Sequence, residues 1–257
     1  MQEICLACGS IDVINCGKPI FHNQDSIYSV FECSKCKLKW SSPMPSDDEL
    51  ALHYNSYYKR RFQRILKTSL KFLRDIITQK YLREYMFLKN TLKYTHVKRF
   101  LDYGCGEGEM LLIGNKFGWE CTGTEYSEEL SESFNKLGIR VIVAKDFENS
   151  TLEQNSFDLI LFKHLIEHIK NISSFLEQAK NYLTKDGVIA IKTPSNTSFR
   201  AKTGTAKWHF VNPPEHLWSF DIHNFKLILE RNGFEVLSIK NSLLVDELIC
   251  YAKVKSK

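Results

Sequence analysis

A short apolar run that ends in a glycine-rich turn constrains the fold of this chain more than any other feature. Phe100–Tyr103 is expected to be the end of a buried strand, and three glycines follow it: Gly104, Gly106 and Gly108. The next residues, Glu109–Phe117, have the pattern of a helix. Because glycine has no Cβ, such a turn lets backbone N–H groups approach a ligand at the start of a helix. The turn therefore predicts a ligand site in an α/β fold.

Two common nucleotide-binding motifs do not match this turn. The dinucleotide fingerprint G-x-G-x-x-G requires a glycine where this chain has Glu109, since Gly108 comes one residue early. No phosphate loop of the form G-x-x-x-x-G-K-[ST] is present in the sequence either. An acidic residue, Asp102, stands shortly before the first glycine. It suits a ligand with a cationic amino-acid portion.

Further strands are expected after the turn, separated by helices. Their ranges are Trp119–Thr124, Ile139–Ala144, Phe157–Phe162, Val188–Lys192, Phe234–Lys240 and Leu248–Val254. This alternation predicts a parallel sheet with helices on both faces. Ligands of such sheets lie outside the carboxyl ends of the strands. Glu125 stands at one of these ends, where a carboxylate can accept both hydroxyls of a ribose.

The pattern D-x-G-x-G-x-G, followed by an acidic residue after the second strand, resembles the class I S-adenosylmethionine-dependent methyltransferases. The run FDLILFKHLIEHI and the later run FLEQAKNYLTKDGVIAIKTPSN resemble the small-molecule branch with the ubiquinone-type O-methyltransferases. The resemblance covers roughly Lys98 to the C-terminus. It implies a Rossmann-like, mostly parallel sheet whose last strand runs antiparallel, inserted beside the sixth. It also implies S-adenosylmethionine as the cofactor.

The resemblance further implies a cofactor site at the ends of the first four strands. Asp146 would face the adenine amino group, and Phe147 would lie against the ring. The complete set of expected cofactor-binding residues is Asp102, Gly104, Cys105, Gly106, Gly108, Glu125, Tyr126, Asp146, Phe147 and Lys163.

Candidate catalytic residues follow the fourth and fifth strands. The methyl group on a sulfonium is an electrophile, so the protein must place a nucleophile behind it and remove the proton of a hydroxyl acceptor. His164 and His168 lie four residues apart and are expected on one face of a helical turn, with Glu167 beside His168. His216 is the third candidate base. Each histidine could equally close the site or cap a helix. In ubiquinone-type enzymes the equivalent turn can hold a divalent metal through two acids and a histidine, and here His164 replaces the first acid.

The long loop from Thr193 to Ser219 is expected to form the wall that binds the methyl acceptor. Long structured loops at the carboxyl ends of strands are usually functional. The candidate substrate contacts in it are Trp208, His209 and Trp218. The alternative is a packed cover whose tryptophans belong to the core.

Two C-x-x-C pairs near the N-terminus predict a zinc site. Their cysteines are Cys5, Cys8, Cys33 and Cys36. Four thiolates in two such pairs match a closed tetrahedral site for one structural Zn²⁺. Alternating apolar residues between the pairs indicate short strands, so the unit is expected to be a zinc ribbon that the metal stabilises. Two redox pairs are the alternative, although neither lies at the strand-to-helix junction of thioredoxin-like pairs.

The chain is expected to have three parts: a zinc ribbon at 1–42, a helical connector at 43–96 and the methyltransferase domain at 97–257. The connector is rich in Lys and Arg near helical spacing, for example Arg60, Arg64 and Lys67. Its basic side is either a solvated helix face or a surface for an anionic substrate or RNA. In the family that the chain resembles this region often forms a lid, so Tyr57 is a further candidate substrate contact.

Composition narrows the classes of function. A net charge of +5 is mild, no apolar run approaches a membrane span, and no secretory signal is evident, so a cytoplasmic protein is expected. The favoured function is O-methylation of a small molecule such as a sugar, a nucleotide-linked sugar or a surface-glycan precursor. The alternatives are an rRNA or tRNA methyltransferase and a non-catalytic binding module. Apolar helix faces would permit a homodimer.

Overall fold

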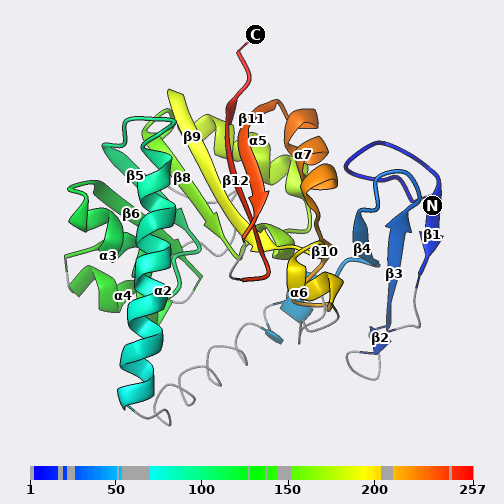
Figure 1. The fold of residues 1–257 in the computed structure, drawn as a ribbon, viewed down its shortest axis with the longest axis horizontal. Helices are drawn as coiled ribbons and strands as arrows, with labels where there is room; N and C mark the ends of the chain where they lie inside the picture. Colours follow the sequence, from blue (N-terminus) through cyan, green and yellow to red (C-terminus); the bar gives the residue numbers. More distant parts are fainter. Residues whose placement is uncertain are drawn as a thin grey trace.

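Two β-sheets organise the chain in the computed structural model. The structure describes residues 3–16, 20–21, 27–50, 52–53, 70–126, 128–136, 138–143, 152–203, 211–242 and 245–256. A seven-stranded sheet carries helices on both faces, and a smaller five-stranded sheet that begins at the N-terminus lies beside it (Figure 1).

The large sheet has the strand order β11-β12-β9-β8-β5-β6-β7. Its strands are β5 (Arg99–Tyr103), β6 (Glu120–Glu125), β7 (Arg140–Val143), β8 (Phe157–Lys163), β9 (Leu183–Pro194), β11 (Phe234–Asn241) and β12 (Glu247–Val254). Neighbours from β7 to β9 are parallel, whereas β12 is antiparallel to both β9 and β11. The predicted Rossmann-like fold class is therefore confirmed, with the last strand beside the sixth.

The strand order reverses beside β5, since β6 and β7 lie on one side of it and β8 and β9 on the other. Ligands of open α/β sheets bind at the carboxyl ends of the strands at such a reversal. The glycine turn follows β5, and the turn that carries His164 and His168 follows β8. Both predicted parts of the site therefore start from neighbouring strands at this point.

Helices and a short 3₁₀ segment connect the strands. They are α2 (Leu70–Thr91), α3 (Glu109–Lys116), α4 (Glu128–Lys136), η1 (Ile166–His168), α5 (Ile172–Tyr182), α6 (Phe199–Lys202) and α7 (Ile222–Arg231). The expected helix after the glycine turn is confirmed as α3. One strand was predicted too short: β9 begins at Leu183 instead of Val188, because the segment Thr184–Gly187 is already extended.

Each face of the large sheet has its own hydrophobic core, and alternate residues of a strand reach opposite faces. Phe100 of β5 packs with Leu88 of α2 and Ile113 of α3. Its neighbour Leu101 packs on the other side, in the cluster that contains Phe175 of α5. The residues of β5 and β8 in both clusters are buried, so packing on both faces of the sheet holds the strands that precede the candidate site.

The smaller sheet is built mainly from the N-terminal segment. It contains β1 (Val13–Asn15), β2 (Ile20–Phe21), β3 (Ile27–Cys33), β4 (Lys39–Ser42) and β10 (Trp218–Ser219). Its order is β1-β3-β4-β10, and β2 pairs with β3. The short strands expected between the cysteine pairs are thus present. The strand β10 was not expected, because it comes from the long loop after β9.

The predicted connector is described only in part. Ser46 and Glu49 form a reciprocal capping interaction, since the Ser46 N–H donates to Glu49 Oε2 (2.9 Å) and the Glu49 N–H donates to Ser46 Oγ (3.2 Å). Tyr57 and the basic residues Arg60, Arg64 and Lys67 lie outside the described residues. Within the described part of the chain, no helix is long and apolar enough to cross a membrane.

Candidate active site

The glycine turn after β5 has the backbone that its sequence predicted. Gly104, Gly106 and Gly108 have φ angles of 73°, 51° and 67°, all in the left-handed region that favours glycine. A Cβ on Gly108 would lie 2.5 Å from the ring of Phe134, whereas a Cβ on Gly106 would meet nothing within 4 Å. The middle of the turn therefore borders open space in which a ligand can approach the backbone.

Carboxylates converge on this turn. Asp102 is 2% exposed, and its Oδ2 has no hydrogen-bond partner among the described residues. Burial raises the pKa of Asp102 to about 7; Lys163 opposes the shift and Glu125 and Glu109 add to it. A buried carboxyl group without a partner is costly. A cation bound beside the turn would relieve this cost.

Glu125 lies at the carboxyl end of β6, as predicted, and bonds the turn directly. Its Oε2 accepts the Gly106 N–H (2.7 Å) and its Oε1 accepts the Tyr126 N–H (2.9 Å). Asp146 and Phe147, the candidates for the adenine, lie outside the described residues.

Lys163 ends β8 and faces acidic side chains from two helices. Its Nζ donates to Glu109 Oε2 of α3 (3.2 Å) and lies 3.6 Å from Glu84 Oε2 of α2. Lys80 of α2 also bonds Glu109, at 2.7 Å. Lys163 thus ties α2 and α3 to the sheet beside Asp102, and it balances the charge of the carboxylates there.

The turn after β8 differs from the predicted helical turn. His164 has a φ of 50° and lies outside η1, which spans only Ile166–His168. The prediction that His164 and His168 share one face of a helical turn is therefore wrong. The His164 N–H still donates to the Lys192 carbonyl (2.8 Å), so β8–β9 pairing continues and delays the helical segment.

Both histidines nevertheless approach the same carboxylate. Glu167 is fully buried, and its Oε1 lies 3.6 Å from His164 Nδ1 and 3.7 Å from His168 Nε2. Its Oε2 accepts the Thr193 hydroxyl (2.9 Å), whereas Oε1 has no hydrogen-bond partner among the described residues. Although burial disfavours the charge, the neighbouring His164 and His168 lower the pKa of Glu167 to about 2.

His164 is held between two carboxylates, which makes it a poor base. Its Nε2 lies 3.0 Å from Glu247 Oε1 on β12, opposite the contact with Glu167. Loss of water around the ring favours the neutral form, although the side chain is 39% exposed, but Glu167 and Glu247 outweigh this effect and raise the pKa of His164 to about 9. His164 is therefore protonated at neutral pH, and it positions Glu167.

The contact with Glu247 belongs to a buried network of ion pairs that sequence reasoning missed. Lys192 is fully buried, and its Nζ bonds Glu84 (2.9 Å) and Glu247 (2.9 Å). Although burial disfavours the charge, the bonds from His164 and Lys192 lower the pKa of Glu247 to about 2. These three charges come from α2, β9 and β12, and no local motif links them.

His168 and His216 form the second half of the cluster. His168 Nδ1 lies 2.8 Å from the Glu215 carbonyl oxygen, which requires the proton on Nδ1 and leaves Nε2 as an acceptor in the neutral ring. The rings of His168 and His216 meet edge to face at a centroid distance of 4.9 Å. Burial and the neighbouring His168 lower the pKa of His216. The neutral His216 imidazole can therefore accept a proton.

The same residues offer a metal site. One ligand atom from each of Glu167, His168 and His216 lies within 4.8 Å of the others. The Glu167 oxygen without a hydrogen-bond partner and the available Nε2 of His168 both fit a divalent cation, for which imidazole and carboxylate are common ligands. The replacement of an acid by His164 therefore does not remove the metal possibility, since His216 supplies another ligand from a different loop.

The four cysteines of the N-terminal pairs come together as predicted. Sγ of Cys5 lies 3.4 Å from that of Cys36, Sγ of Cys8 lies 3.5 Å from that of Cys33, and all four lie within 4.8 Å of one another. Tetrahedral zinc with bonds of about 2.3 Å requires sulfur atoms about 3.8 Å apart. The cluster thus fits one zinc ion, and it has no open position for catalysis.

Of the predicted substrate contacts, only Trp218 lies within the described residues, which exclude Tyr57, Trp208 and His209. Trp218 is buried, its Nε1 donates to the Ile169 carbonyl (2.8 Å), and its ring lies 6.4 Å from that of Trp40. This environment matches the alternative interpretation, a core tryptophan between the two sheets, and leaves its contact with substrate a prediction.

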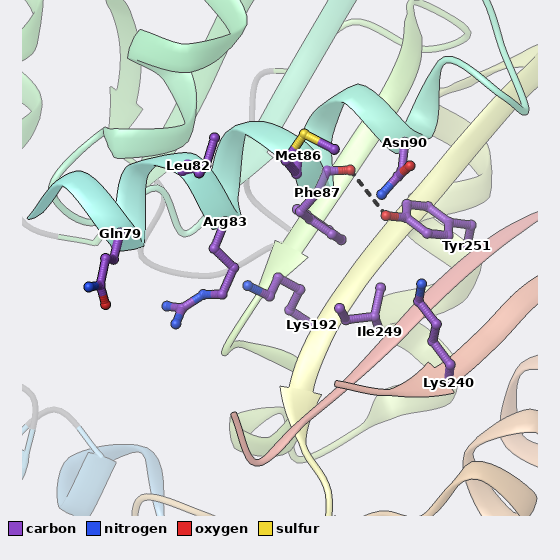
Figure 2. A pocket seen from close by; sticks show the side chains of 10 residues that line it. All are labelled: Gln79, Leu82, Arg83, Met86, Phe87, Asn90, Lys192, Lys240, Ile249 and Tyr251. Carbon is purple, nitrogen blue, oxygen red and sulfur yellow. Dashed lines mark hydrogen bonds between the residues drawn. The ribbon is translucent and has the colours of Figure 1, made fainter. Parts of the chain in front are cut away.

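A separate cavity of about 490 Å³ lies between α2 and the strands β9, β11 and β12 (Figure 2). Its lining residues are Gln79, Leu82, Arg83, Met86, Phe87, Asn90, Lys192, Lys240, Ile249 and Tyr251. None of the residues predicted for the site lines it. Lys192 belongs to both the cavity wall and the buried ion pairs.

The chain matches the model of the methyltransferase domain over residues 53–239. This match spans well over half of the 257 residues, so the chain belongs to the methyltransferase domain family. It is therefore an enzyme of the methyltransferase class.

Individual relatives are more distant. The ubiquinone biosynthesis O-methyltransferase of Bradyrhizobium diazoefficiens is 23% identical over 188 residues, 66% of this chain and 73% of the relative. The enzyme of the same name from Rhodopseudomonas palustris (strain BisB18) is 25% identical over 208 residues, 72% of this chain and 79% of the relative.

Solved structures agree on the fold. The 1,6-didemethyltoxoflavin-N1-methyltransferase of Burkholderia thailandensis, solved with 1,6-didemethyltoxoflavin and S-adenosylhomocysteine, has a TM-score of 0.61 and 14% identity and covers 93% of this chain and 100% of that chain. The plantazolicin methyltransferase BpumL, in complex with S-adenosylhomocysteine, has a TM-score of 0.52 and 20% identity over 70% of this chain and 85% of that chain.

Proposed function

We propose that the chain transfers the methyl group of S-adenosylmethionine to a hydroxyl group of a small molecule, such as a sugar, a nucleotide-linked sugar or a surface-glycan precursor. The observation that carries the proposal is a juxtaposition at one edge of one sheet. The buried side chain of Asp102, whose Oδ2 has no hydrogen-bond partner among the described residues, lies beside an open glycine turn after β5, and a histidine cluster follows the adjacent strand β8.

The relatives support the same chemistry. The ubiquinone biosynthesis enzymes are named as O-methyltransferases, and two structures of the same fold were solved with S-adenosylhomocysteine. A location in the cytoplasm is part of the proposal, since a reducing compartment keeps four cysteines as thiolates for zinc.

When bound, the cofactor supplies an electrophilic methyl group on a positively charged sulfur. The residues of this chain would bind and orient it. Asp102 would face its cationic part, because a buried carboxylate favours a nearby positive charge. Glu125 would accept the ribose hydroxyls while it continues to accept the Gly106 N–H, and this shared bond would fix the ribose relative to the turn.

His216 is the proposed general base, with His168 as the residue that orients it. Neutral imidazole is required to accept the proton of an acceptor hydroxyl, and burial keeps His216 neutral by lowering its pKa. His168 is fixed by its bond to the Glu215 carbonyl and packs edge-on against His216. Glu167 would stabilise the positive charge that the pair gains.

A divalent cation is the alternative to this acid–base chemistry. It would be held by Glu167, His168 and His216, and it would lower the pKa of an acceptor hydroxyl bound to it. Assays with and without added Mg²⁺, Mn²⁺ or Zn²⁺ after chelation would distinguish the two mechanisms. Only the metal-dependent mechanism loses turnover when the metal is removed.

Calorimetry with S-adenosylhomocysteine tests the proposal without knowledge of the acceptor. The wild-type chain is expected to bind with a micromolar Kd. Glu125→Ala should abolish detectable binding, whereas Glu120→Ala, a matched change at the exposed start of the same strand, should leave the affinity unchanged. Absence of a binding heat with both S-adenosylmethionine and S-adenosylhomocysteine in the wild type would refute the proposed function.

A further inference from the structure

The N-terminal sheet shares backbone hydrogen bonds with the candidate active site. Strand β4 pairs with β10, with Trp40 opposite Trp218 and Lys39 opposite Ser219. The residue before β10 is Leu217, and the residue before that is the candidate base His216. The edge of the cysteine-rich sheet therefore lies along the segment that carries this histidine.

Leu217 is bonded on both sides, and this fixes its neighbour. Its carbonyl accepts the Ser41 N–H from β4 (2.9 Å), and its own N–H donates to the Glu167 carbonyl in the catalytic turn (2.9 Å). The side chain of Leu217 is fully buried. One residue thus links the N-terminal sheet, the His216 loop and the Glu167–His168 turn.

The cysteine cluster anchors the same region from a second direction. The side chain of Asn224, in the first turn of α7, donates to the Cys36 carbonyl (3.3 Å) and is fully buried. Helix α7 follows β10 directly along the chain. Both ends of the segment from Leu217 to Asn224 are therefore held by the N-terminal sheet or its cysteine knuckle.

Packing joins the two parts into one core. The buried cluster that contains Cys5, Cys33 and Cys36 also contains Leu217 and Phe225. In Figure 1 the N-terminal sheet lies beside β10 and α7, on the side of the large sheet where these elements run. An independent module tethered by a linker would not share a core with the domain that it serves.

We propose that the N-terminal ribbon is a positioning element of the active site: the four-cysteine cluster holds the β3–β4 hairpin, and β4 holds His216 against Glu167 and His168 through Leu217. Ser41, Trp40 and Leu217 are the positioning residues. The proposal rests on the assignment of His216 to the site in the proposed function. It contrasts with a ribbon that recruits a separate partner.

The test follows the histidines by NMR in the full-length chain. The Cε1–Hε1 resonances of His168 and His216 are assigned from the spectra of His168→Gln and His216→Gln. Zinc content and the Kd for S-adenosylhomocysteine are measured on the same samples. The variants are Cys33→Ser/Cys36→Ser, which removes two ligands, and Cys16→Ser as the matched control at an exposed cysteine outside the cluster.

The double variant is expected to lose its zinc and to shift or broaden the His216 resonance, while Cys16→Ser leaves it unchanged. The Kd for S-adenosylhomocysteine should change less than about threefold, because the cofactor residues lie on β5 and β6. An unchanged His216 resonance in the zinc-free chain would overturn the proposal. Failure of the wild type to bind S-adenosylhomocysteine would instead refute the proposed function.

A second variant covers the case in which the double variant does not fold. Trp40→Leu keeps all four cysteines and removes the ring that packs against Trp218 and Phe31. It is expected to retain one zinc per chain and still to shift the His216 resonance. If the zinc is retained and the His216 resonance does not move, the ribbon does not position this histidine and the proposal fails.

Discussion

Asp102 offers a prediction in which the requirements of ligand binding and of stability oppose each other. Its carboxyl group is buried beside the glycine turn, and burial raises its pKa from 3.8 to about 7. The folded chain therefore binds this proton more tightly than the unfolded chain does. As the pH rises from about 4 to about 7, the free energy of unfolding should fall. Above that range the folded chain bears the full cost of the charged, buried Asp102 carboxylate.

The size of the effect follows from the shift. About three pKa units correspond to about 4 kcal/mol, which is an upper bound because water can enter the turn. Asparagine has nearly the same shape and no charge to bury. The ligand-free Asp102→Asn variant should therefore be more stable than the wild type at pH 8. Its advantage in the free energy of unfolding should be larger at pH 8 than at pH 5 by about 2.5 kcal/mol.

Urea unfolding of the ligand-free chain at pH 5 and pH 8 measures this difference. Asp186→Asn, the same substitution at an exposed position, is the control and should have no pH-dependent effect of this size. The affinity of Asp102→Asn for S-adenosylmethionine should fall, since this variant lacks the carboxylate that we propose to face the cationic cofactor. A stability difference that is the same at both pH values would refute the reasoning.

Three other predictions concern separate parts of the site. Lys192→Met should lower the free energy of unfolding, measured with urea, by about 3–5 kcal/mol, because it leaves Glu84 and Glu247 buried without their partner. The control Lys240→Met, on the exposed rim of the cavity, should lower it by less than about 0.5 kcal/mol. Gly106→Ala should weaken binding of S-adenosylhomocysteine by about tenfold in calorimetry, since its Cβ would occupy the open space beside a strained left-handed residue. If the chain methylates a small molecule, it should elute early from a heparin column; retention that requires high salt would favour RNA.

The sheet and the glycine turn could be predicted because their signals are local. A strand, a glycine turn and a helix are contiguous in sequence, and the left-handed φ angles of the turn require glycine wherever they occur. Glu125 was found in the same way, since it ends a strand that begins within a few residues of the previous helix. Two cysteine pairs are also a local signal, and their sulfur atoms meet as the spacing implied.

The histidine half could be predicted only as a list of residues. The spacing of His164 and His168 suggested that they lie on one face of a helical turn. The left-handed backbone at His164 places it outside that turn. The charge of His164 depends on Glu247, 83 residues further along the chain, and on Lys192, which orients that carboxylate. Neither has a neighbouring motif that would mark it, because both lie in strands that read as ordinary buried segments.

The strand β10 shows most clearly what sequence periodicity leaves out. Two residues pair with β4 and no more, so the segment has no alternating pattern that a strand prediction could detect. Its importance comes from its position between the hairpin that carries Cys33 and Cys36 and the turn that carries Glu167. The sequence also left the role of Trp218 open. A large aromatic side chain in a long loop can either line the site of the methyl acceptor or pack in the hydrophobic core. Its pairing with Trp40 favours the core, and that pairing links the ribbon to the chemistry proposed for the enzyme.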